Sequence, residues 1–320
     1  MSNKISHTNP LVSIVIPTFN RAGKIKASIN KALSQNYPNI EIIVVDDGSA
    51  DETESVVTAF AREEKRIRYF RIPNSGISAA RNKGAIEARG EFITFIDDDD
   101  ELLPSYLEAV VPKIRAGSDK IGAVGSGFIL EDQSGFKSYS CPRAEPFWDC
   151  IVGSGWTFRR DVFIKTNLWF DESFRGHEDS EFSIRFRQKY DVLVIDQPLR
   201  IYRMTFTNFK KKYLSLSSDR SRDYTYYKKF IEKHFEVFKK AGPDAVAMVT
   251  FRAGVFFGQS GRMGESRDML KTSLKSQFSL RALLYFLFTF FGFRTFFWFD
   301  FFKNRTMRFL RVFFLNKSQI

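Results

Sequence analysis

Short apolar runs alternate with longer amphipathic stretches along the first third of the chain. The apolar runs are rich in β-branched and aromatic residues, as buried strands are, and they occupy residues 11–16, 40–45, 67–72 and 92–96. The stretches that follow them place apolar side chains at helical spacing, over residues 24–35, 52–64, 77–89 and 104–115. This alternation predicts an α/β fold with a right-handed, doubly wound and mainly parallel sheet.

Two of the predicted strands end in acidic residues. Asp46 and Asp47 follow the strand at 40–45, and four consecutive carboxylates, Asp97–Asp100, follow the strand at 92–96. Because parallel strands present their carboxyl ends at one edge of a sheet, we expect both groups to border a shared cleft. Adjacent carboxylates repel one another, whereas Mg²⁺ or Mn²⁺ binds to one or two carboxylates together with substrate phosphates. The run 97–100 therefore favours a metal–diphosphate site, with a solvated acidic turn as the alternative.

Residues 118–205 follow a less regular pattern. Strands are predicted at 121–130, 136–140, 153–158 and 191–195, followed by a return towards the cleft at 198–203. Glu178 and Asp179 begin a helix, where the helix dipole favours acidic side chains, and we expect backbone hydrogen bonds to keep Asp179 ionised at neutral pH. Such a carboxylate suits a general base that deprotonates an acceptor hydroxyl, and a simple capping pair is the alternative.

Five sequence motifs occur in order at these strand and helix ends: VSIVIPTFNR (12–21), IVVDDGSADET (43–53), SGISAARNKG (75–84), GEFITFIDDDD (90–100) and HED (177–179). Together they closely resemble family 2 of the inverting glycosyltransferases, whose catalytic domain has the GT-A fold. The resemblance covers about residues 10–205. It implies a catalytic domain at 1–205, with a nucleotide-sugar half at about 10–117 and an acceptor half at about 118–205, and leaves residues 206–320 as a helical C-terminal region.

The resemblance also implies residues that bind a nucleoside diphosphate sugar. Pro17 and Phe19 stand where the family lines the nucleobase pocket, and Asp47 stands where it has an acid that contacts the base. Arg81 matches a position near the nucleotide. These four residues are therefore expected at the donor side of the cleft.

The acidic run matches the family's Asp-x-Asp motif. In that alignment Asp97 lies towards the ribose, and Asp99 holds Mn²⁺ or Mg²⁺ on the donor diphosphate. The additional acid Asp98 leaves the register open by one position, so it too is a candidate donor-binding residue. The expected cofactor is a single divalent cation.

On the acceptor side, Asp179 matches the catalytic base, and Glu178 beside it orients the base or the acceptor. Many family members carry a histidine shortly after a Tyr-Arg pair near the end of the catalytic domain. Here Met204 and Thr205 follow Tyr202-Arg203 instead, so a third protein ligand to the metal is in doubt.

Charge and aromatic residues set the C-terminal region apart. The net charge of +12 arises there, because residues 203–320 contain 23 Lys and Arg against 8 Asp and Glu, whereas residues 1–202 contain 26 against 29. Between Phe278 and Phe314 lie 14 of the 36 phenylalanines, and the longest uncharged run, Ala282–Phe293, is shorter than the ~20 residues that span a bilayer.

These features predict interfacial helices at about 278–315 that lie on an anionic membrane surface. The alternatives are packing against the catalytic domain or a second subunit in a homo-oligomer, and a partly re-entrant segment. Nucleic-acid binding is disfavoured because the aromatic residues form apolar Phe clusters rather than single rings in a basic groove. The polar N-terminus lacks a signal peptide's apolar core, and Cys141 and Cys150 cannot form a disulfide framework. Both observations favour a cytoplasmic protein, peripheral on the inner face of the membrane.

The predicted function is metal-dependent, inverting transfer of a hexose or N-acetylhexosamine from a nucleoside diphosphate donor, expected to be UDP, to a glycan or lipid-linked acceptor. Cell-surface polysaccharide or lipopolysaccharide synthesis is the expected setting. A non-catalytic nucleotide-sugar-binding or scaffold protein of the same fold is the rival hypothesis. A nucleotidyltransferase is disfavoured because the loop after the first strand has no glycine before Gly23, where such enzymes carry a Gly-rich phosphate loop.

Overall fold

The computed structural model describes residues 9–132, 135, 137–142, 144, 153–204, 216–292 and 295. The chain divides into two compact units, Met1–Phe209 and Lys210–Ile320. The predicted domain boundary, between Thr205 and residue 206, falls outside the described residues. Most of the tail beyond Gly292 also lies outside them.

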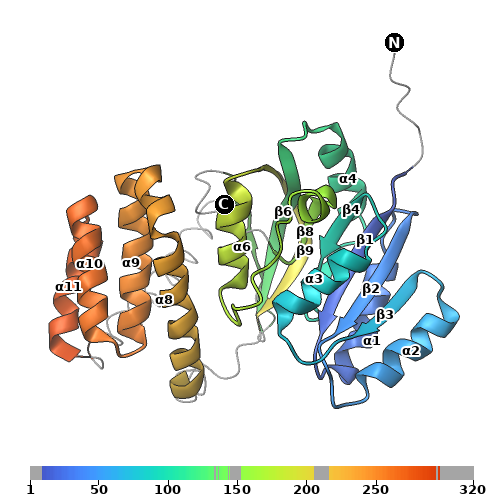
Figure 1. The fold of residues 1–320 in the computed structure, drawn as a ribbon, viewed down its shortest axis with the longest axis horizontal. Helices are drawn as coiled ribbons and strands as arrows, with labels where there is room; N and C mark the ends of the chain where they lie inside the picture. Colours follow the sequence, from blue (N-terminus) through green and yellow to red (C-terminus); the bar gives the residue numbers. More distant parts are fainter. Residues whose placement is uncertain are drawn as a thin grey trace, which may run out of the picture. The chain divides into compact units, whose positions relative to one another are not determined.

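The first unit is a nine-stranded mixed sheet with helices on both faces (Figure 1). Its first half contains β1 (Val12–Thr18), α1 (Ala22–Leu33), β2 (Ile40–Asp46), α2 (Thr53–Glu63), β3 (Ile67–Arg71), α3 (Ile77–Glu87), β4 (Phe92–Phe95), β5 (Glu101–Leu102) and α4 (Tyr106–Ala116). Its second half contains β6 (Ile121–Asp132), β7 (Lys137–Ser140), β8 (Trp156–Arg159), α5 (Asp161–Ile164), α6 (Glu178–Arg187) and β9 (Asp191–Met204).

The strand order is β3-β2-β1-β4-β8-β6-β9-β5, with β7 beside β6. Strands β1 to β4 pair in parallel, and β8 then joins β4 in the antiparallel direction. The carboxyl ends of β1, β2 and β4 consequently meet at one edge, as a doubly wound sheet requires. The predicted α/β fold is confirmed.

Both faces of the parallel strands are buried, which explains their continuous apolar sequences. Ile14 and Ile16 of β1 pack with side chains of α1, α2 and α4, whereas Val15 packs on the opposite face with Ala80 of α3. Helix α3 approaches β1 closely at Gly84, where an added Cβ would lie 2.2 Å from Val15 Cγ1. The small residues of α3 therefore bring its polar side chains near the strand ends.

The last strand differs from its prediction. The sequence indicates a break between 191–195 and 198–203, but β9 continues from Asp191 to Met204. Pro198 lies opposite Gly127 of β6, at a register shift in the ladder. Because proline has no N–H to donate, an irregular position is where a strand accommodates it. The short antiparallel strand β5, which pairs with β9, has no counterpart in the sequence pattern.

The second unit contains the helices α8 (Leu216–Ala241), α9 (Pro243–Gln259), α10 (Met263–Ser276) and α11 (Leu280–Phe288), followed by the 3₁₀ turn η2 (Thr289–Phe291). Helices α9 and α10 pack closely at Gly254, where an added Cβ would lie only 2.6 Å from Leu270 Cγ. The buried Ser266 and Ser273 hydroxyls each donate to a carbonyl of α9. The predicted helical character of the C-terminal region is confirmed for residues 216–292, whereas most of the predicted interfacial segment 278–315 lies outside the described residues. None of the described helices combines the length and apolar character needed to cross a membrane.

Candidate active site

Arg81 of α3 lies at the centre of an acidic cluster. Its guanidinium donates to Asp97 Oδ1 at 2.9 Å, just after β4, and to Asp179 Oδ1 at 2.7 Å, in the first turn of α6. Glu178 Oε1 is 3.7 Å from the same group. The Arg81 side chain is 1% exposed and packs against the Phe170 ring. Arg81, itself one of the expected residues, thus brings together three of the expected acids, Asp97, Glu178 and Asp179.

Three carboxylates share this single guanidinium, so the cluster carries excess negative charge. Burial raises the pKa of Asp179 to about 7; the Arg81 guanidinium opposes this, and Glu178 and Asp97 add to it. The sequence predicted that backbone hydrogen bonds would keep Asp179 ionised, but in the structure its carboxylate accepts from Arg81 instead. Its pKa is raised towards neutrality, so the expectation of full ionisation at neutral pH is corrected. Such a pKa lies near the value at which a general base works best.

The four acids after β4 alternate in exposure. Asp97 and Asp99 have side chains that are 26% and 30% exposed, whereas Asp98 and Asp100 are buried. Asp98 Oδ2 accepts a hydrogen bond from Thr18 Oγ1 at 2.7 Å, which ties the run to the end of β1. Burial raises the pKa of Asp100 to about 7, and Asp97 and Asp99 add to the shift. Asp97 and Asp99 are thus the carboxylates of the run that are more accessible to a ligand, because Asp98 and Asp100 are buried.

Ser154, which the sequence did not single out, connects the acids to the returning strand. Its hydroxyl accepts from the Asp97 N–H at 2.9 Å and donates to Asp100 Oδ2 at 3.2 Å. Arg200 of β9 donates to the Ser154 carbonyl at 2.7 Å. Beside it, an added Cβ on Gly153 would lie 2.5 Å from the Asp179 carboxyl carbon, so the backbone closely approaches the candidate base. The Gly-Ser-Gly sequence at 153–155 was the available signal.

Tyr202 of β9 also lies near these acids. Its pKa is raised to about 12 by burial and then by the charges of Asp100, Asp97, Asp99 and Asp179. The side chain is nevertheless 48% exposed. A half-exposed tyrosine thus lies within electrostatic range of these carboxylates. Met204 ends this strand, and Thr205, where the family histidine was sought, lies outside the described residues.

The predicted nucleobase residues occupy the ends of β1 and β2. Pro17 is buried within β1, and Phe19 follows that strand with 44% of its surface exposed. Asp47 accepts hydrogen bonds from the backbone N–H groups of Ser75 at 2.7 Å and Gly76 at 2.9 Å. Its carboxylate therefore positions the loop that leads into α3 and Arg81.

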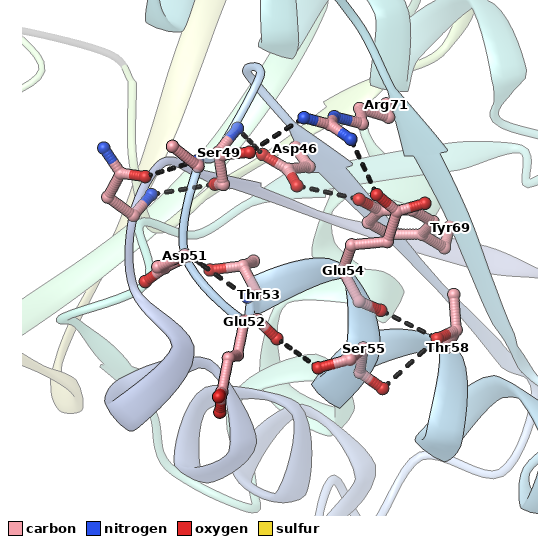
Figure 2. Close-up of polar contacts among 12 residues, drawn as sticks. Asp46, Ser49, Asp51, Glu52, Thr53, Glu54, Ser55, Thr58, Tyr69 and Arg71 are labelled. Atoms are coloured by element: carbon pink, nitrogen blue, oxygen red, sulfur yellow. Dashed lines mark hydrogen bonds and ion pairs between the residues drawn. The ribbon is translucent and has the colours of Figure 1, made fainter.

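Figure 2 shows how the loop after β2 is fixed. Asp46 accepts from the Ser49 N–H at 2.8 Å and from the Tyr69 hydroxyl at 2.7 Å. Arg71 of β3 donates to the Ser49 carbonyl at 2.8 Å and pairs with Glu54 at 2.7 Å. Side chains from the neighbouring strand β3 thus hold the loop in place.

Oxygen donors for a hard divalent cation lie in the acidic run after β4. Within the described residues, no group of three or more His, Cys, Asp and Glu side chains could hold a metal ion. Sites for Mg²⁺ commonly use only one or two carboxylates and take further oxygens from substrate phosphates. The partly exposed Asp97 and Asp99 supply oxygen donors of this kind, and Asp99 Oδ2 lies 3.7 Å from Arg21 Nη2. The residues therefore fit a metal that is completed by its substrate.

A family model described as glycosyl transferase family 2 matches residues 13–204, which is more than half of the chain. The chain belongs to glycosyltransferase family 2. This confirms the resemblance seen in the sequence motifs. The match extends from β1 to the end of β9 and therefore contains Arg81 and the acids that it binds.

Two curated glycosyltransferases are similar to this chain, each over 61% of its length. The uncharacterized glycosyltransferase EpsJ of Bacillus subtilis is 32% identical over 61% of this chain and 61% of its own length. A Campylobacter jejuni protein named GalNAc(5)-diNAcBac-PP-undecaprenol beta-1,3-glucosyltransferase is 33% identical over 61% of this chain and 65% of its own. The chain thus spans less than two thirds of each of these relatives.

Two solved structures share the fold. The mannosyltransferase PcManGT of Pyrobaculum calidifontis, in complex with GDP-Man and Mn²⁺, has a TM-score of 0.57 at 18% identity, covering 87% of this chain and 79% of that one. Residues 1–349 of S. aureus TarS have a TM-score of 0.53 at 16% identity, covering 83% and 88%. At these identities the likeness supports the GT-A fold, and that prediction is confirmed.

Proposed function

We propose that this protein is an inverting glycosyltransferase that moves a sugar from a nucleoside diphosphate donor to a hydroxyl of a glycan or lipid-linked acceptor. The observation that carries the proposal is the ion-pair cluster at Arg81. One buried guanidinium binds both Asp97, the proposed donor-binding acid, and Asp179, the proposed base. A donor-binding acid and a candidate base are thereby held in fixed positions on one cation.

Asp179 acts as the general base in this proposal. Its carboxylate takes the proton of the acceptor hydroxyl as the acceptor oxygen bonds to the anomeric carbon of the sugar. The bond between that carbon and the diphosphate oxygen breaks, and its electron pair leaves with the nucleoside diphosphate. Attack from the face opposite the leaving group inverts the anomeric configuration in one displacement. No nucleophilic carboxylate is required.

Arg81 is a positioning residue for this base. Its buried guanidinium fixes the Asp179 carboxylate, and it limits the rise in pKa that burial and neighbouring acids impose. Glu178, whose carboxylate is 3.7 Å from the same guanidinium, supports the orientation of the base or the acceptor. The pKa of the Asp179 carboxyl, raised to about 7, thus remains within the range in which a general base can work.

Asp99 would hold Mn²⁺ or Mg²⁺ on the donor diphosphate, and Asp97 would lie towards the ribose. A bound ion would supply Lewis-acid stabilisation of the negative charge on the departing diphosphate. Support comes from the partial exposure of both carboxylates and from their place at the end of β4. A structural neighbour has been solved with GDP-Man and Mn²⁺.

We further propose a UDP-sugar as the donor, carrying a hexose or an N-acetylhexosamine. TarS has been solved with UDP and with UDP-GlcNAc, and the name of the C. jejuni relative describes glucosyl transfer to an undecaprenol-linked glycan. These findings support a lipid-linked acceptor in cell-surface polysaccharide or lipopolysaccharide synthesis. Phe19, which is exposed after β1, and Asp47 remain proposed contacts for the nucleobase of the donor.

A donor panel tests the proposal. The purified chain is incubated with UDP-, GDP-, dTDP- and CMP-sugars in Mn²⁺, in Mg²⁺ and in chelator, while nucleotide release and thermal stabilisation are measured. We expect one donor, a UDP-sugar, to stabilise the protein and to release nucleoside diphosphate only with metal. Folded protein that binds a donor without releasing nucleotide, with or without acceptor, would support the non-catalytic scaffold hypothesis instead.

A further inference from the structure

Helix α11 is apolar on two opposite faces. One face carries Ala282, Tyr285 and Thr289, which are at most 2% exposed, with Tyr285 packed beside Leu270 of α10. The opposite face continues through η2 and is exposed: Leu280 is 64% exposed, Leu284 39%, Leu287 47% and Phe291 70%. These four residues, together with Phe290 at 60%, form the outer face of α11.

The spacing of these residues makes a continuous stripe rather than scattered exposure. Positions 280, 284, 287 and 291 recur every three or four residues, which places them on one side of a helix. Surface helices normally present polar side chains to water on this side, and helices that are apolar all round are covered. Contiguous exposed apolar surfaces of this kind mark an interaction site. The outer face of α11 therefore needs a partner.

Charge identifies the partner. The sequence contains no Asp or Glu between Asp268 and Asp300, whereas Lys271, Lys275 and Arg281 are cationic and exposed. The Arg267 guanidinium lies 5.0 Å from the centre of the Phe290 ring, at the outer face itself. A second copy of the chain, or residues 293–320 with one acid and six Lys and Arg, would place positive charge against positive charge.

We propose that the outer face of α11 binds the surface of an anionic lipid bilayer. The apolar stripe enters the boundary between headgroups and acyl chains, and Arg267, whose guanidinium lies against Phe290, contacts the headgroup phosphates. The helix lies on the membrane, because α11 has nine residues and a spanning helix needs about 20. This binding is independent of the donor site in the other unit, so it stands or falls separately from the proposed transfer reaction.

Vesicle binding tests the proposal. The full chain is mixed with phosphatidylcholine vesicles that contain or lack phosphatidylglycerol, and bound protein is measured by sedimentation at several salt concentrations. We expect binding to the anionic vesicles that weakens as salt rises, and little binding to the neutral ones. The double variant Leu280→Ser/Phe291→Ser changes the two most exposed positions of the stripe. Its affinity for anionic vesicles should fall by at least about tenfold.

The matched control is Ile86→Ser/Ile164→Ser, which replaces two exposed apolar side chains of the first unit. It should bind vesicles as the unchanged protein does, and both double variants should keep donor-dependent nucleotide release without vesicles. Equal vesicle binding by the α11 variant would overturn the proposal. Failure of the unchanged chain to bind anionic vesicles would also overturn it. In that case, a dimer that the α11 variant dissociates would identify a second copy as the partner, and binding only after removal of residues 293–320 would identify that segment.

Discussion

The acids at the carboxyl end of β2 are bound by their own loop and its neighbours, whereas those after β4 share arginines. Asp46 and Asp47 accept four hydrogen bonds, three from backbone N–H groups and one from Tyr69. Asp97 pairs with Arg81, and Asp99 lies near Arg21. A carboxylate held by backbone N–H groups fixes a loop. One that competes with other acids for a single cation leaves negative charge for a ligand to neutralise.

The largest effect is expected where the acidic cluster meets the acceptor. Asp179→Asn keeps the shape of the side chain but cannot take a proton, so transfer should fall by about 10²–10⁴-fold with nearly unchanged donor affinity. Nucleotide release with acceptor and calorimetric donor binding measure the two quantities. Asp161→Asn, at an exposed surface ion pair, is the matched control. A variant at 179 that kept most of its activity would assign the base to another residue.

Asp99→Ala tests the donor side of the same cluster. Removing this partly exposed carboxylate should abolish the part of donor binding that depends on Mn²⁺ or Mg²⁺. Thermal stabilisation by a UDP-sugar would then be the same with metal as with chelator. Asp161→Asn again serves as the control and should keep the metal response. If Asp99→Ala retained that response, the metal would be bound elsewhere in the run.

Asp47→Asn tests the other side of the comparison. The amide nitrogen cannot accept a hydrogen bond, so one of the N–H groups of Ser75 and Gly76 loses its partner. We expect the free energy of unfolding, measured in urea, to fall by about 1–3 kcal/mol. Donor affinity should fall less than it does in Asp99→Ala. A loss of donor affinity without any loss of stability would make Asp47 a nucleotide contact only, and the contrast between the two strand ends would disappear.

The smallest effect is the pH dependence of the unmodified protein. The pKa of Asp179 is about 7 in the folded state and about 4 in the unfolded state, so the folded state binds the extra proton between these values. This contribution to stability is complete below about pH 4 and is lost as pH rises through about 7. The base becomes ionised over the same range, so kcat/KM should rise with pH through about 7. A profile without an acidic limb would contradict the assignment.

The sequence alone determined the parallel core, the acidic strand ends and the family. Those features depend on local patterns: β-branched runs, helical spacing and motifs at strand ends. The apolar character of 278–291 was equally visible. Which face of α11 stays exposed was not, because that depends on its packing against α10.

Only the tertiary structure decided the partners of the acids. Arg81 and Asp179 are 98 residues apart, and their contact depends on how closely α3 packs on β1 and where α6 begins. Ser154 lies in an irregular segment with no periodic signal, yet its hydroxyl bonds both Asp97 and Asp100. The ionisation of Asp179 follows from burial and from the competition of three acids for one arginine. Local sequence specifies which groups are charged, whereas only the folded chain specifies which charges share a partner, because those partners come from distant elements.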